Sequence, residues 1–144
     1  MTSPLRKPHI DTMRIKRETD YAIRCVVHLV RRPGEVASIE EISKGILVPK
    51  KFLAKILQKL AGAGIVKSHR GAKGGFELAR DPALINFLDI MEAIQPVEMN
   101  ICAMDDRLCS LSNACAVHPV WVEVREEVRA ILAIRNFARF RAGP

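Results

Sequence analysis

Three closely spaced cysteines are the residues of this chain best suited to chemistry. Cys102, Cys109 and Cys115 follow the pattern C-x6-C-x5-C, and His118 comes three residues after the last of them. Thiolate sulfur and imidazole nitrogen match iron and zinc as ligands. In a chain without a secretory signal, clustered thiols indicate metal or redox chemistry more often than structural disulfides. The sequence therefore predicts a cysteine-rich sensing or metal-binding loop.

The cysteine spacing leaves three kinds of site open. It differs from a zinc ribbon, which needs two tight C-x2-4-C pairs, and from the C-x2-C-x2-C run of a ferredoxin. An iron–sulfur cluster on a flexible loop is the favoured interpretation. A zinc site made by the three cysteines and a histidine, and redox-active thiols without a metal, are the alternatives.

Positive charge is concentrated in one part of the chain. The chain carries a net charge of +7, yet residues 42–76 contain eight Lys or Arg and no Asp or Glu. Charge segregated in this way favours a phosphate backbone as partner. The same charge segregation disfavours the alternative function of a small electron carrier that uses an iron–sulfur cluster without binding DNA. No Ser/His/Asp set or paired carboxylates stand out, so we expect no enzyme activity.

Helix signals precede and surround the basic segment. Apolar residues recur at helical spacing over 14–32, and Pro33-Gly34 ends that helix. Ser38 and Glu41 form the S-x-x-E pattern of a capping box, which opens a short helix ending near Gly45. Pro49 is well placed in the first turn of a third helix, over 49–61. Two helices joined by a short turn indicate a helix-turn-helix.

The third helix is predicted to be apolar on one face and basic on the other. At about 100° per residue the apolar face collects Phe52, Leu53, Ile56, Leu57 and Leu60. Such a helix can pack on a domain while its basic face enters a DNA groove. The candidate DNA-binding residues on it are Lys50, Lys51, Ala54, Lys55, Gln58 and Lys59.

A glycine-rich hairpin follows the third helix. Residues 65–69 and 75–79 are predicted strands around the turn Arg70-Gly-Ala-Lys73-Gly. Arg70 and Lys73 at the tip predict a wing that contacts phosphates or the minor groove. A phosphate-binding nucleotide loop is excluded because a strand, not a helix, follows the glycines.

The remainder of the chain is predicted to connect and to dimerise. A short helix is expected from Asp81 to Ile94, then irregular chain over 95–113, then a long helix over 117–140. Along the last helix a coiled-coil spacing is followed by Val117, Trp121, Val124, Val128 and Ile131. Since little chain remains to cover this stripe, we expect it to pair with a second copy; packing on its own domain is the alternative.

These motifs together resemble the Rrf2 family of winged-helix transcription regulators. The likeness rests on RIKRETDYAIR (14–24), FLAKILQKL (52–60), GIVKSHRGAKGGF (64–76) and the cysteine trio, and it covers about residues 13 to 135. The resemblance implies a homodimer that binds double-stranded DNA, as a repressor or dual regulator, and reports iron–sulfur status, redox state or nitric oxide.

The resemblance also implies a ligand set. Cys102, Cys109 and Cys115 match the family's cysteine ligands, although the first gap is one residue longer than in the iron–sulfur-regulating branch. His118 matches that branch's fourth ligand and slightly favours a [2Fe–2S] cluster. Asp20 matches the carboxylate that the nitric-oxide-sensing branch supplies from the partner subunit, which would favour [4Fe–4S].

DNA-contacting positions carry over in the same way. Lys51, Ala54 and Lys55 match the base-contacting positions of the third helix, and Arg70 matches the wing arginine. The iron–sulfur branch has a carboxylate where Ala54 stands here. Without that acceptor for cytosine, we expect a different operator sequence.

Four segments are expected along the chain: a flexible extension (1–12), a winged helix-turn-helix (13–81), a connecting helix with the cysteine loop (82–116), and a dimerisation helix with its tail (117–144). The fold class is therefore mainly α with a small β-hairpin wing. No apolar run approaches the roughly 20 residues of a membrane span. We expect a cytoplasmic protein with no membrane partner.

Overall fold

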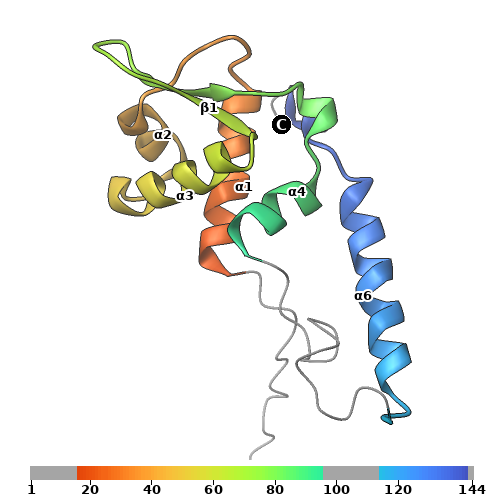
Figure 1. The fold of residues 1–144 in the computed structure, drawn as a ribbon. Helices are drawn as coiled ribbons and strands as arrows, with labels where there is room; N and C mark the ends of the chain where they lie inside the picture. The colour runs from red at the N-terminus through yellow and green to blue at the C-terminus, as the bar shows by residue number, and fades with distance from the viewer. Residues whose placement is uncertain (1–15, 96–113, 143–144) are drawn as a thin grey trace, which may run out of the picture.

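A computed structural model describes residues 16–95 and 114–142 (Figure 1). The elements, labelled as in Figure 1 with η for 3-10 helices, are α1 Arg17–Val30, α2 Ile39–Ile46, α3 Lys50–Gly62, β1 Val66–His69, β2 Gly75–Leu78, η1 Pro82–Leu84, α4 Phe87–Ile94, α6 His118–Ala133 and η2 Phe137–Phe140. This confirms the predicted fold class of helices with one β-hairpin. The expected extension over 1–12 and most of the cysteine loop lie outside the described residues.

The hairpin is a short antiparallel sheet fastened to the helices at its base. Val66 pairs with Leu78, and His69 pairs with Gly75. Ala37 adds a bridge to Phe76, where each backbone N–H donates to the other residue's carbonyl at 2.9 and 2.8 Å. The segment before α2 is therefore hydrogen-bonded to the base of the hairpin.

The core surrounds α1, which contacts α2, α3 and α4 (Figure 1). Ala22, Cys25, Val26 and Leu29 supply its buried face, as the helical periodicity predicts. Ser38 caps α2 as predicted: its hydroxyl accepts from the N–H of Glu41 while the Glu41 carboxylate accepts from the N–H of Ser38. Two of the N–H donors that a helix start leaves unpaired are thereby satisfied.

The predicted apolar face of α3 is correct except at its edge. Leu53, Ile56, Leu57 and Leu60 are buried, but Phe52 is 47% exposed. At about 100° per residue Phe52 lies roughly 90° from the centre of that face. Its ring is instead covered by Lys51, whose Nζ lies 5.1 Å from the ring centroid.

The predicted helix over 81–94 is two elements instead of one. Asp81 caps the short helix η1, accepting from the N–H of Ala83 at 2.7 Å. Ile85 is then extended and fully buried. Asn86 begins α4 with a second capping box, formed with Asp89. Two successive capping residues therefore interrupt the helix and place Ile85 in the core.

The last helix is also shorter than predicted, because α6 ends at Ala133 and not at Phe140. Asn136 caps the short helix η2, and Phe137 behind it is fully buried. The extended residues Asn86 and Asn136 form an antiparallel bridge. The chain thus returns to the core after α6, where a continuous helix to Phe140 was predicted.

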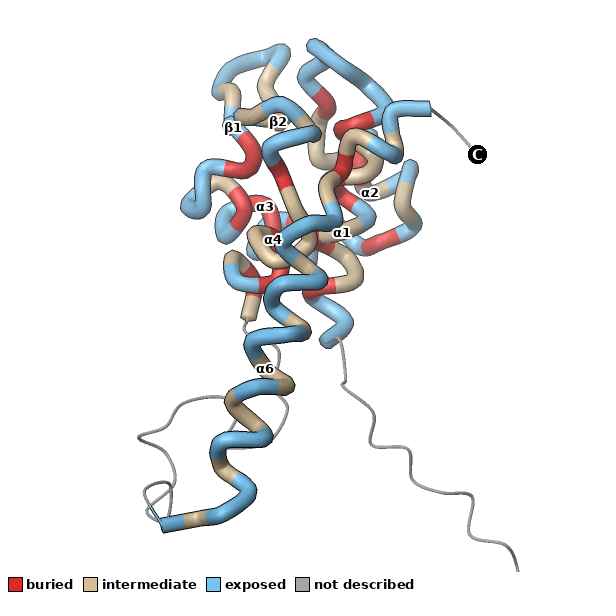
Figure 2. The backbone as a smooth tube through the Cα atoms, turned by 90° about the vertical axis from the view of Figure 1, so that its right-hand side faces the viewer, coloured by how far each residue is buried: buried red, intermediate tan, exposed pale blue. Residues whose placement is uncertain are grey.

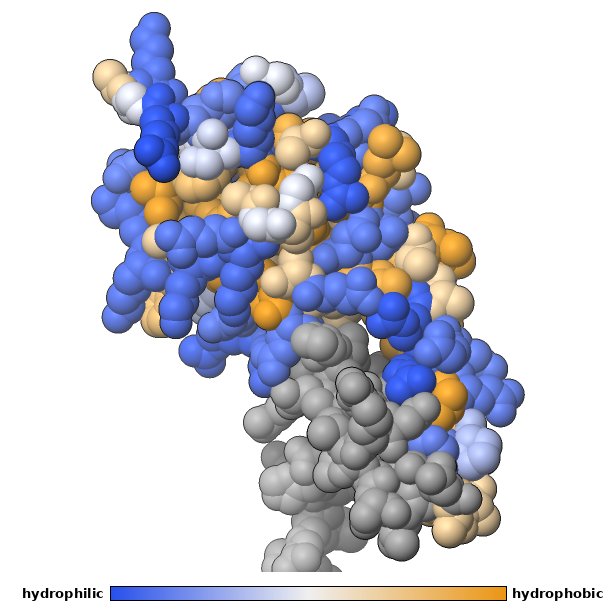
Figure 3. Space-filling model, viewed as in Figure 1, coloured by the Kyte–Doolittle hydropathy of each residue, from blue (hydrophilic) through white to orange (hydrophobic). Residues whose placement is uncertain are grey.

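α6 itself extends away from the core (Figure 2). None of its residues is buried. Val120 and Ile131 are both 55% exposed, and the predicted stripe residues Trp121, Val124 and Val128 are half-buried. Hydrophobic side chains interspersed with hydrophilic ones follow this helix at the lower right of Figure 3.

Candidate nucleic-acid interface and metal-ligating residues

The structure places α2 and α3 on either side of a tight turn. Leu47, between them, is the one described non-glycine residue in the left-handed region (φ 57°), and its N–H donates to the carbonyl of Ser43. The Ser43 hydroxyl donates to the carbonyl of Val48 at 2.7 Å. These contacts fix the angle between α2 and α3, which is the arrangement of a helix-turn-helix.

All six predicted DNA-binding residues of α3 are exposed: Lys50, Lys51, Ala54, Lys55, Gln58 and Lys59. Their contacts differ. Lys50 forms an ion pair with Glu40 of α2 at 3.0 Å, and Lys59 forms one with Glu18 of α1 at 3.1 Å. Neither carboxylate could be predicted from the local sequence, because only the fold brings them beside α3.

The hairpin carries the other two predicted DNA contacts, Arg70 and Lys73, on the exposed turn between β1 and β2. Gly71 in this turn has φ +106°, which a side chain would disfavour. Below the turn, His69 Nε2 lies 2.8 Å from Glu77 Oε1 across the two strands. Figure 1 shows the tip projecting beyond the helices on the side of α2 and α3. The hairpin tip and α3, which both carry exposed cationic residues, therefore lie toward the same side of the molecule.

Two of the predicted metal ligands lie at the start of α6. Cys115 is a half-buried free thiol, and its carbonyl accepts from the N–H of His118 at 3.2 Å. This backbone hydrogen bond keeps Cys115, just before α6, close in the chain fold to His118, the first residue of the helix. A thiol and an imidazole so placed fit the donor preferences of an iron–sulfur cluster or zinc.

The other predicted ligands are not brought to this place by the described residues. Cys102 and Cys109 lie outside them. Asp20 is in the first turns of α1, paired with Arg24 at 3.0 Å, and that end of α1 lies apart from the start of α6 in Figures 1 and 2. Residues 16–95 and 114–142 contain no group of three potential metal ligands.

Two further titratable groups are packed between helices. Cys25 is fully buried, as expected of a small apolar residue, and burial raises the pKa of its thiol to about 12. Burial, followed by the nearby Arg32 cation, lowers the pKa of His28 below its ordinary value. The His28 ring lies against Gly45 of α2. Cys25 therefore lacks the character of a nucleophile, since a thiol needs a lowered pKa to react.

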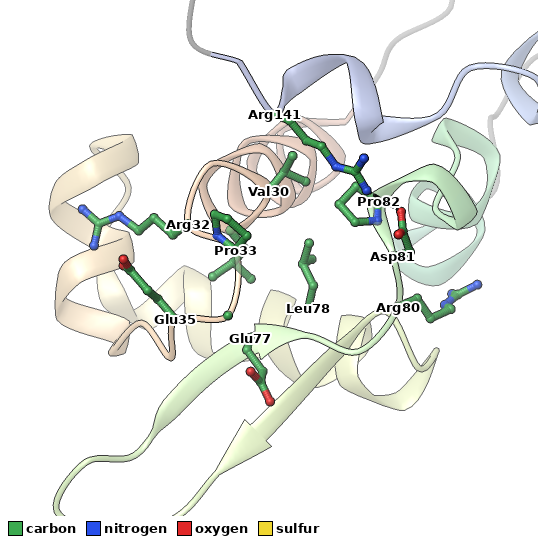
Figure 4. A pocket seen from close by; sticks show the side chains of 12 residues that line it. Val30, Arg32, Pro33, Glu35, Glu77, Leu78, Arg80, Asp81, Pro82 and Arg141 are labelled. Atoms are coloured by element: carbon green, nitrogen blue, oxygen red, sulfur yellow. Dashed lines mark hydrogen bonds and ion pairs between the residues drawn. The ribbon is translucent and has the colours of Figure 1, made fainter.

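A cavity of about 440 Å³ lies at the base of the hairpin, between the end of α1, β2 and η2 (Figure 4). Val30 and Leu78 point into it, whereas Arg32, Glu35 and Arg80 point away. At its rim Arg141 and Asp81 form an ion pair at 2.6 Å. An apolar interior without convergent polar groups does not have the character of a catalytic site.

Comparison with known families agrees with this geometry. The model of the Rrf2 family, described as an iron-dependent transcriptional regulator, matches residues 15–141. The chain belongs to the Rrf2 family. It is accordingly a DNA-binding transcriptional regulator with a winged-helix fold, and not an enzyme.

Individual relatives and solved structures are also similar to this chain. The chain is 31% identical over 126 residues to the HTH-type transcriptional regulator NsrR of Bacillus subtilis, covering 85% of this chain and 84% of NsrR. Two solved structures share the fold. CymR, the global cysteine regulator of B. subtilis, has a TM-score of 0.69 at 23% identity and covers 90% of this chain and 97% of CymR. IscR of T. potens has a TM-score of 0.66 at 24% identity, covering 87% and 83%.

Within the two described ranges of this Rrf2-family chain, no helix combines the length and the apolar character that a membrane span requires.

Proposed function

We propose that this Rrf2-family regulator binds operator DNA as a cytoplasmic homodimer and reports iron–sulfur status, redox state or nitric oxide through a cluster. Cys102, Cys109 and Cys115 would hold the cluster, with His118 or the partner's Asp20 as fourth ligand; His118 favours [2Fe–2S]. Residues 13–81 would read DNA, 82–116 would sense, and 117–144 would dimerise.

The observation that carries the DNA-binding part is the exposed cationic side of α3 and the hairpin. Lys51, Lys55 and Gln58 are exposed on one side of a helix whose other side is buried. Arg70 and Lys73 extend the charge to the hairpin tip. A helix entering the major groove with a wing on the backbone uses this division between base contacts and phosphate contacts.

The dimer is supported by the apolar residues that α6 leaves uncovered. Val117, Val120, Ile131 and Ile134 are all more than half exposed. Adjacent to them run the half-buried Trp121, Val124 and Val128. A helix with a polar remainder and an apolar stripe at coiled-coil spacing is stabilised when it pairs with another helix.

The cluster is supported by the cysteine spacing, by the family's iron-dependent description, and by the Cys115–His118 pair at the start of α6. The cluster would supply iron that responds to oxidants and nitric oxide. The protein's own residues would transmit the response, because His118 is the first residue of the helix proposed to dimerise and Cys115 is hydrogen-bonded to it through the backbone. We expect ligation and DNA affinity to be coupled by about 1–3 kcal/mol, the usual range for allosteric coupling.

A same-fold regulator that senses through thiols is the second candidate. Cys115 is a free, half-buried thiol, and the chain shares its fold with CymR, a cysteine regulator. A zinc site or a small-molecule ligand would belong to the same alternative. Anaerobic purification separates these functions: visible absorption with bound iron and sulfide supports the cluster, and zinc or no metal opposes it.

A gel-shift at fixed salt with DNA from upstream of the chain's own gene tests the remainder of the proposal. Lys55→Ala and Arg70→Ala should weaken binding about 5- to 100-fold without loss of the cluster colour, and Arg139→Ala in η2 is the charge-matched control. Cys109→Ala should lose the colour. Retention of full colour by Cys109→Ala would contradict the ligand assignment, and failure of wild type to retain DNA would contradict DNA binding.

Substitution on α6 tests the dimer. Val124→Lys with Val128→Lys places two charges in the apolar stripe, whereas Ala130→Lys places one on the opposite side of the same helix. Sedimentation velocity should show a monomer for the first variant and a dimer for the second. A wild-type protein that sediments as a monomer would contradict the dimer proposal.

A further inference from the structure

The exposed side of α3 has a lysine at each of its two edges. At about 100° per residue, Lys51, Lys55 and Gln58 lie within roughly 60° of one another along the centre. Lys50 and Lys59 lie about 100° and 80° away from Lys51, in opposite directions. The predicted DNA-binding lysines of α3 therefore divide into two central and two edge residues.

Each edge lysine is held by a carboxylate from a different helix. Lys50 Nζ lies 3.0 Å from Glu40 Oε1 of α2, and Lys59 Nζ lies 3.1 Å from Glu18 Oε2 of α1. The two partners are 10 and 41 residues away in sequence, so tertiary structure creates both pairs. The hydrogen bond from Lys50 lowers the pKa of Glu40, which keeps that carboxylate ionised.

The contacts of the central lysines differ from those of the edge lysines. Lys51 Nζ lies over the Phe52 ring, and among the described residues neither Lys51 nor Lys55 forms an ion pair with a carboxylate. Residues 42–76 contain no acidic residue, so α1 and α2 provide the negative charges that border this side of α3. The two central lysines of α3 are thus available to DNA, whereas the charges of the two edge lysines are neutralised by carboxylates.

We propose that Glu18 and Glu40 are specificity-determining residues, which compete with DNA phosphates for Lys59 and Lys50 and so suppress sequence-independent binding. This inference rests on the proposed DNA-binding function of α3. Sequence-independent affinity comes almost entirely from phosphate contacts. Contacts from the central side chains to base edges distinguish one sequence from another and do not use the edge lysines.

Removing a carboxylate therefore has unequal effects on two kinds of DNA. It frees one lysine for a phosphate and removes one negative charge that repels the backbone. On unrelated DNA the added phosphate contact and the lost repulsion are a large fraction of the total attraction. At the operator, base contacts made by the central side chains already hold the DNA close enough for its phosphates to displace the carboxylate from the lysine. Specificity gained by repelling wrong partners is a general device. Exposed ion pairs contribute little to folding, so the variants should fold.

The test uses Glu18→Gln, Glu40→Gln and the double variant of the full chain. Fluorescence anisotropy measures binding to the upstream duplex and to a scrambled duplex of equal length and composition, over a salt series. Each substitution should raise affinity for the scrambled duplex about three- to fivefold and steepen its salt slope by about 0.9. Affinity for the upstream duplex should rise less, so the ratio of the two affinities falls.

Two controls make the outcome decisive. Glu126→Gln, on the side of α6 opposite the apolar stripe, changes the net charge equally, far from α3, and should leave the ratio unchanged. Lys59→Ala in the Glu18→Gln background should cancel the gain on scrambled DNA. Glu18 and Glu40 variants that match Glu126→Gln would overturn this inference alone. A wild type that binds neither duplex would overturn the proposed function and this inference with it.

Discussion

Phe137 stacks on Phe87 with ring centroids 4.7 Å apart and an angle of 15° between the ring planes. The two rings come from η2 and from the first residue of α4, and Phe140 contacts both at an angle. Backbone bonds reinforce the stack: the N–H of Phe87 donates to the carbonyl of Arg135, and the N–H of Phe137 to that of Ile85. The segment after α6 is therefore an integral part of the core.

Phe137→Ala should destabilise the protein by about 3–5 kcal/mol, because it removes a fully buried ring and leaves a cavity. Urea unfolding followed by circular dichroism measures this. Phe52→Ala, which removes a half-exposed ring, should cost about 1 kcal/mol or less. Equal losses for the two variants would show that η2 does not belong to the core.

Gly45→Ala should destabilise the protein although alanine is the better helix former by about 1 kcal/mol. A Cβ at this position would overlap Cε1 of His28 and lie 2.7 Å from its Nδ1. The double variant with His28→Ala should recover stability, since the obstacle is then gone. Thermal unfolding of both single variants and the double variant gives the coupling; additive effects would contradict the proposed overlap.

The free energy of unfolding should decrease as the pH is lowered, because the folded protein resists protonation of His28. Burial, and then Arg32, lower the pKa of His28 in the folded protein below 6.5, its ordinary value. Below about pH 6.5 the unfolded chain binds a proton that the folded chain resists, so unfolding becomes more favourable; above it, this group has no effect. Urea unfolding between pH 5 and 8 should show a flatter profile for His28→Gln, and identical profiles would refute this prediction.

Cys25 and Cys115 should react differently with iodoacetamide. Cys25 has no exposed surface and a pKa of about 12, so its thiolate is scarce and inaccessible. Cys115 is half-buried and free. Mass mapping of metal-free native protein should find Cys115 modified and Cys25 modified only after unfolding. Early labelling of Cys25 would mean that α1 leaves the core readily.

Local signals in the sequence were sufficient for the winged-helix part. The capping box at Ser38, the buried side of α3 and the glycine-rich hairpin each depend on residues within a few positions of one another. The prediction of the buried side of α3 was wrong at Phe52. This residue lies at the edge of the apolar side, where its ring could be either buried or exposed, and it is exposed.

Long-range contacts could not be predicted from the sequence. Nothing near Glu18 indicates that its partner is Lys59. Phe137 would lie on the side of a longer α6 opposite the predicted stripe, and only the bridge between Asn86 and Asn136 shows that the chain turns back. The metal-ligand set stays a prediction, because Cys102 and Cys109 lie outside the described residues.

The attachment of α6 at one end makes it a lever arm. Its last turns are fixed by the ion pair of Arg129 with Glu92, at 2.7 Å, and by Phe137 in the core, while Cys115 and His118 stand at the far end. Sixteen residues of helix measure about 24 Å. A displacement of about 2 Å at that far end therefore corresponds to a tilt of only about 5° at the pivot. Small rearrangements around the thiols would be converted into rotation of the whole winged helix-turn-helix.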